Sequence, residues 1–106
     1  MISGNADQWL EGIFKKYVGI SAEIIESLRG AVQGGQLEEI HRLAHKLKGS
    51  SSSVGADRIA AIVGRMDDKQ YRITLDEHRV LLQDLEKEFR LFCKTVEIRY
   101  ENKEKV

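Results

Sequence analysis

The chain has 106 residues, of which 42% are hydrophobic and 32% are charged, which suits one soluble globular domain with a charged exterior. Its 17 basic and 17 acidic residues cancel, so no overall basic field exists and we expect no nucleic-acid partner. No apolar run approaches the roughly 20 residues that span a bilayer, and the N-terminus lacks a secretory pattern. Cys93 is the single cysteine, so we expect no disulfide within the chain, which fits a reducing compartment. Together with the missing apolar span and secretory pattern, this indicates a cytoplasmic location and no membrane partner.

The absence of proline and of any alternating strand pattern predicts an all-α fold. The first predicted helix covers about 6–18, where Asn5 and Gln8 form a capping-box pattern and Gly19 ends the helix. Its apolar stripe, which includes an aromatic set, is expected to contact the core: Trp9, Leu10, Ile13, Phe14 and Tyr17. A second helix is predicted from Ser21, as its N-cap, to about Gln33.

Three more helices are expected after the glycine pair at 34–35. The third begins near Gln36 with two glutamates in its first turn, and the fourth covers about 56–69. A connector lies within 67–73, and Thr74 then opens the last helix, with Glu77 completing a capping box. The last helix has a seam that recurs at steps of three and four, and His78 is expected to be a satisfied residue at the core margin: His78, Leu82, Leu85, Phe89, Phe92 and Val96.

These helices predict one domain over residues 1–106. Its core, at about 21–100, is expected to be an antiparallel up-down four-helix bundle, because short links join the helices. The additional short N-terminal helix at 6–18 would cover an end or a flank of this bundle. The charged tail at 101–106 is expected to fray.

The third helix has two distinct faces. One is a core face: Leu37, Ile40, Ala44, Leu47 and Ser51. The adjoining face joins two imidazoles, an ammonium, a bare backbone position and a hydroxyl: His41, His45, Lys48, Gly49 and Ser52. A glycine inside a helix costs about 1 kcal/mol against alanine, and one use for that cost is clearance beside His45. The serines at 50–53 can stay helical where packing supports them.

The stretch "HKLKGSSSSVGA" resembles the signature of histidine-containing phosphotransfer (HPt) domains, which is His-x-(Leu/Ile)-Lys-Gly and two small residues, then Gly. The matching positions are His45, Leu47, Lys48, Gly49, Ser50, Ser51 and Gly55. The resemblance implies that His45 accepts a phosphoryl group from a receiver-domain aspartate and passes it to another receiver domain. It also implies that Lys48 stabilises the phosphoryl oxygens and that Gly49 leaves room for phosphate and partner.

The same resemblance implies a phosphocarrier without kinase activity and without a cofactor, since the required Mg²⁺ belongs to the receiver domain. Its partners would be receiver domains of response regulators and a hybrid histidine kinase, and we expect the protein itself to be a monomer. The face around His45 would dock these partners through His41, Arg42 and Ser52.

Family members often place a glutamine or similar polar residue on the following helix, whereas this chain reads "GRMDD" there. Asp67 or Arg65 could face His45. If Asp67 does, it could accept the other ring N–H and orient the imidazole, although it would also repel phosphate.

Two other interpretations concern the role of the histidines. The chain could be a helical docking module for receiver domains with a vestigial histidine. Such a module would bind a receiver domain and never carry phosphate. His41 and His45 have the spacing of a metal pair, but Arg42 stands where a zinc protease needs glutamate. Two ligands are also too few for a zinc site, so we expect no metal.

Overall fold

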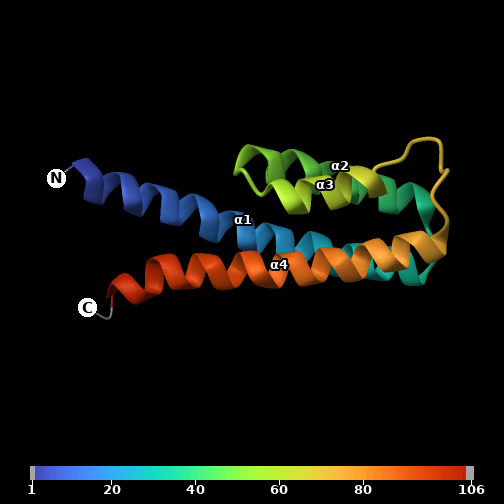
Figure 1. Cartoon of the computed structure of the whole chain (residues 1–106). Coiled ribbons are helices and arrows are strands. Elements are labelled where there is room, and N and C mark those ends of the chain that lie inside the picture. The colour runs from blue at the N-terminus through green and yellow to red at the C-terminus, as the bar shows by residue number, and fades with distance from the viewer. Residues whose placement is uncertain (1, 105–106) are drawn as a thin grey trace.

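The computed structural model describes residues 2–104, with side chains placed from 7 to 100. Within that range the chain forms four helices and no strand, which confirms the all-α prediction. They are α1 (Ile2–Gln33), α2 (Leu37–Ser53), α3 (Asp57–Met66) and α4 (Leu75–Glu104) (Figure 1). The predicted frayed tail is helical through Glu104, and residues 105 and 106 lie outside the described part of the chain.

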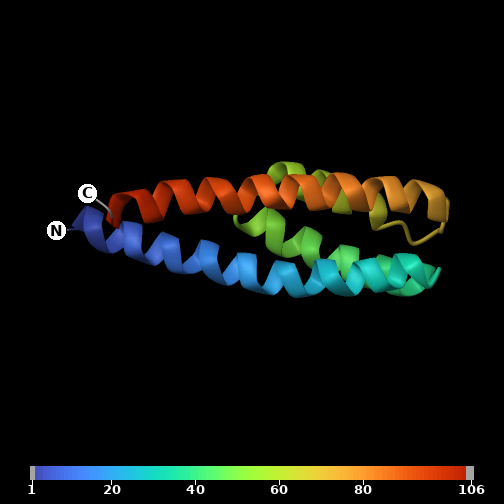
Figure 2. The ribbon, with the colours of Figure 1, turned by 90° about the horizontal axis from the view of Figure 1, so that it is seen from below.

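The two long helices, α1 and α4, run side by side in opposite directions (Figures 1 and 2). The shorter pair α2 and α3 packs on them at the end far from the chain termini (Figure 1). Each helix contacts its neighbours in sequence, and α1 also contacts α4, so the four helices close a bundle. Because α1 and α4 extend beyond α2 and α3, the molecule is elongated, with extents of 51 × 21 × 18 Å.

The prediction of a separate N-terminal helix is wrong, because residues 6–18 and 21–33 belong to the single helix α1. Gly19 lies on the exposed side, where a Cβ would meet no atom within 4 Å, so it neither terminates the helix nor assists packing. Ser21, predicted as an N-cap, is fully buried inside α1. It continues a buried stripe with Tyr17 and Ile24, and burial of that stripe outweighs the modest cost of one glycine. The predicted cap at Asn5 is also wrong, because α1 begins at Ile2 and Asn5 lies inside the helix.

The fourth predicted helix ends too late: α3 stops at Met66 instead of continuing to about 69. Asp68 explains the loop that follows, because its carboxylate accepts the backbone N–H groups of Gln70, Arg72 and Ile73 at 3.2, 2.6 and 3.2 Å. Burial would raise the pKa of Asp68, but hydrogen bonds from Arg72 and Gln70 outweigh it and lower the pKa. The loop is therefore held by one carboxylate.

The start of α4 confirms the predicted capping box. The Thr74 hydroxyl accepts the Glu77 backbone N–H at 3.1 Å, and the Thr74 backbone N–H donates to Glu77 Oε1 at 3.4 Å. The seam of α4 also faces inward, with His78, Leu82 and Leu85 buried.

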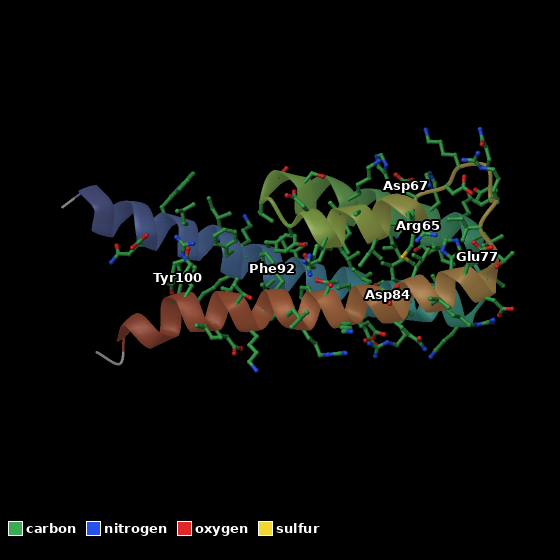
Figure 3. All side chains as sticks on the ribbon, viewed as in Figure 1. Arg65, Asp67, Glu77, Asp84, Phe92 and Tyr100 are labelled. Atoms are coloured by element: carbon green, nitrogen blue, oxygen red, sulfur yellow. The ribbon has the colours of Figure 1, made fainter. Side chains whose placement is uncertain are left out.

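The aromatic residues divide between the inside and the outside of the bundle. Phe14 and Tyr17 of α1 contact the Phe92 ring edge-on, with centroids 6.0 and 5.2 Å apart, and Tyr100 is also buried (Figure 3). Trp9, in contrast, is 68% exposed, so its predicted core contact is wrong. The first turns of α1 extend beyond the α2–α3 pair (Figure 1).

Candidate functional site

Helix α2 presents the two faces that the sequence predicts. Ile40, Ala44, Leu47 and Ser51 are buried, together with Leu43, which the predicted core stripe did not include. The Ser51 hydroxyl forms a buried 2.7 Å hydrogen bond with the Tyr17 hydroxyl, which ties α2 to α1. On the other face, His45, Lys48, Gly49 and Ser52 are exposed. These four residues of α2 are therefore open to solvent.

The serine run is helical through Ser53, as expected. Ser50 and Ser53 donate their hydroxyls to backbone carbonyls one turn earlier, at Leu47 (3.2 Å) and Gly49 (3.0 Å). The helix then ends in a turn where Gly55 has φ +76°, a left-handed conformation that favours glycine. The hydroxyls of these two serines thus have partners within α2, and the helix ends one turn beyond Gly49.

His45 contacts Asp67, the residue that follows the last residue of α3. The Nδ1 atom of His45 lies 2.9 Å from Asp67 Oδ2, within hydrogen-bond distance. The His45 side chain is 69% exposed, whereas the Asp67 side chain is only 7% exposed. Asp67 lies directly after the end of α3 (Figure 3), and its carboxylate reaches the imidazole on α2. The site thus combines an exposed imidazole with a covered carboxylate beneath one of its edges.

The same carboxylate lies near two other side chains of α2. Its second oxygen, Oδ1, is 2.5 Å from Nδ1 of His41, although that nitrogen is out of line for a hydrogen bond. Lys48 Nζ lies 3.8 Å from Oδ2. The side chain of His41 is 19% exposed and that of Lys48 is 50% exposed, so neighbouring atoms restrict His41 more than Lys48. Asp67 is therefore the common neighbour of the three polar side chains.

Two glycines shape the surface beside His45. A Cβ on Gly49 would meet no atom within 4 Å, so the space above it is open. A Cβ on Gly64 of α3 would lie 3.9 Å from Cδ of Lys48, so the Lys48 stem crosses α3 at that glycine. Gly64 was not among the site residues predicted from the sequence. A glycine inside a predicted helix, one residue before Arg65, was the available signal.

The remaining predicted site residues do not contact His45. Arg65 is exposed and forms no ion pair with the described residues, so of these two candidates only Asp67 reaches the imidazole. Arg42 pairs with Glu39 through two hydrogen bonds of 2.6 and 2.7 Å. That pairing lowers the pKa of Glu39 through the hydrogen bond from Arg42. Ser52 is exposed further along α2.

Among the described residues, no group of three or more His, Cys, Asp and Glu side chains is arranged to hold a metal ion. Over the same residues, no helix has both the length and the apolar character needed to cross a membrane.

One of three comparisons with known proteins gave a match. A family model, the Hpt domain, matches residues 13–97 of the 106-residue chain. A search of curated proteins and a search of solved structures each gave no match. The matched segment includes His45 and its neighbours, most of α1 and α4, and the whole of α2 and α3. The chain therefore belongs to the Hpt domain family, whose members are phosphocarriers that act through histidine phosphotransfer in phosphorelay signalling.

Proposed function

We propose that this protein is a phosphorelay intermediate that accepts a phosphoryl group on His45 from a receiver-domain aspartate and passes it to another receiver domain. The supporting observation is the exposed His45 imidazole, whose Nδ1 lies 2.9 Å from the covered carboxylate of Asp67. An exposed nucleophile on a regular helix can enter the active site of another protein, while the buried partner keeps the ring in one orientation.

Asp67 selects which ring nitrogen reacts. An ionised carboxylate only accepts hydrogen bonds, so Nδ1 of a neutral His45 carries the proton and donates it to Oδ2. The lone pair is then on Nε2, at the other edge of the ring. Nε2 is therefore the proposed site of phosphorylation.

The proposed transfer of the phosphoryl group to His45 needs no proton from solvent. The Nε2 lone pair forms the N–P bond while the bond from phosphorus to the receiver's aspartate oxygen breaks, and the aspartate leaves with that electron pair. The His45 ring gains positive charge as the N–P bond forms, and the Asp67 carboxylate on the Nδ1 side stabilises this charge. Because Asp67 faces Nδ1, its carboxylate lies across the ring from a phosphoryl group on Nε2. This separation weakens the repulsion between the two negative groups.

Lys48 is proposed to bind the phosphoryl oxygens. Its half-exposed ammonium lies 3.8 Å from Asp67 Oδ2, on the same face of α2 as His45. An ammonium there can form charge-assisted hydrogen bonds with a phosphoryl group, and it also offsets the negative charge of Asp67. Gly49 leaves open space next to both side chains.

The proposed partners are receiver domains, including that of a hybrid histidine kinase, and the Mg²⁺ is proposed to belong to the receiver. The protein would need no cofactor and would act as a cytoplasmic monomer. Arg42 and Ser52 are exposed near His45 and remain the proposed docking residues, together with the uncovered part of His41.

The test is incubation of the purified protein with a phosphorylated receiver domain. We expect label that is acid-labile and base-stable, and we expect His45→Gln to lose it while circular dichroism shows unchanged helicity. Lys48→Ala should slow the transfer and leave the fold intact, because the side chain is at the surface. Label that persists in His45→Gln would refute the assignment, and receiver binding without any label would favour a docking module with a vestigial histidine.

A further inference from the structure

Asp67 can orient His45 only if its own carboxylate is held in place. The neighbouring Asp68 is fixed by three backbone N–H groups, but no backbone N–H of the described residues donates to Asp67. The orientation of the Asp67 carboxylate therefore depends on side chains of α2.

His41 is the side chain best placed to supply this support. It lies one helical turn before His45 on α2, with the two ring centroids 6.2 Å apart. Its Nδ1 is buried and has no hydrogen-bond partner among the described residues, and Asp67 Oδ1 is 2.5 Å away. A buried polar atom without a partner is unfavourable, so a small rotation that pairs the two groups is favourable.

Lys48 is less suited to the same task. Its ammonium is 3.8 Å from Oδ2, the oxygen that already accepts from His45, and its side chain is half exposed on a flexible stem. It contributes charge near Asp67 but does not fix the direction of the carboxylate.

We propose that His41 is a positioning residue for phosphotransfer. Its Nδ1–H holds Oδ1 of Asp67, so that Oδ2 stays directed at His45 and the His45 proton stays on Nδ1. This inference rests on the proposed function only in that His45 is the nucleophile. It gives His41 a positioning role within the site, in addition to its proposed role in docking a partner.

The first test is the nitrogen NMR spectrum of the His45 ring in the full chain, at a pH where the ring is neutral. In the wild-type protein we expect the Nδ1–H form to predominate. His41→Leu should shift the ring toward the Nε2–H form, as should Asp67→Asn. His41→Asn should keep the wild-type spectrum, because the asparagine amide nitrogen can occupy the place of Nδ1. Lys46→Ala, an exposed neighbour on α2, is the matched control and should change nothing.

The second test is the rate of phosphoryl transfer from a phosphorylated receiver domain. His41→Leu should slow it roughly tenfold, the scale of a modest loss of positioning, while His41→Asn restores most of the rate. An unchanged His45 spectrum in His41→Leu would overturn the inference. So would equal slowing by His41→Leu and His41→Asn, which would indicate docking. If the wild-type protein takes no label, the proposed function fails, whereas the spectra still decide the role of His41.

Discussion

Asp67 shows how the place of a single residue depends on where a helix ends. It is separated from His45 by 22 positions in the sequence, and the two meet at the point where α3 stops at Met66. The loop that follows is held by Asp68, so adjacent aspartates have different tasks. One organises the backbone, and the other is available to an imidazole.

Gly49 allows a prediction in which stability and activity change in opposite directions. Gly49→Ala adds a methyl group in open space on a helix, so the free energy of unfolding should rise by up to about 1 kcal/mol. Phosphoryl transfer should become slower, because the methyl group occupies the clearance beside His45. Urea unfolding and transfer from a phosphorylated receiver domain measure the two effects.

Gly30→Ala is the matched control for this change, since Gly30 also lies in a helix with open space around it, on α1. It should stabilise the protein similarly and leave transfer unaffected. A wild-type transfer rate in Gly49→Ala would show that the clearance is not needed.

At the scale of elements, α1 is the clearest difference from the sequence-based prediction. Gly19 and Ser21 form a local stop-and-start pattern, yet the helix continues through both. The reason is tertiary: Tyr17, Ser21 and Ile24 are buried at helical spacing, so an interruption would remove this stripe from the core.

Gly19→Ala tests the continuity of α1 in solution. In a continuous helix the alanine should raise the free energy of unfolding by about 1 kcal/mol, because no neighbouring atom opposes its methyl group. If Gly19 instead ended a helix in a left-handed conformation, the same change would destabilise the protein. Chemical denaturation distinguishes the two outcomes by the sign of the change.

The N-terminus of α4 gives a second prediction at this scale. Thr74→Ala removes the hydroxyl that accepts the Glu77 N–H and should lower the free energy of unfolding by about 1 kcal/mol. Thr74→Ser keeps the hydroxyl and should remain close to wild type. Equal stability of the alanine and serine variants in urea would indicate that the cap contributes little.

At the scale of the whole molecule, one buried histidine makes stability depend on pH. His78 of α4 is 3% exposed, and its Nδ1 has no hydrogen-bond partner among the described residues, so the expectation of a satisfied histidine is wrong. Burial lowers the pKa of His78, while the nearby charges of Asp68 and Glu77 act in the opposite direction. The folded protein therefore resists a proton that the unfolded chain accepts.

The free energy of unfolding should consequently fall as the pH drops from neutrality through about 6.5, where a histidine in the unfolded chain becomes protonated. The contribution of His78 to stability is present above that range and is lost below it. Urea unfolding at several pH values measures this slope. In His78→Gln the slope should be smaller than in the wild-type protein, and an unchanged slope would assign the effect to other groups.

The sequence by itself determined the features that depend on local chemistry. The glycine turn after α2, the Thr74–Glu77 capping box and the division of α2 into a core face and a face with His45 all follow from residues within one or two turns of each other. The motif around His45 lies within one helix and the turn that follows it, which is why it could be recognised from the sequence.

Only the tertiary structure decided which groups meet His45. The sequence left Asp67 and Arg65 as equal candidates and gave no sign that His41 lies against Asp67 or that Lys48 crosses Gly64. The continuity of α1 and the early end of α3 were also beyond local patterns. Each of these depends on side chains packed between helices, and burial of distant partners there outweighs the propensity of single residues.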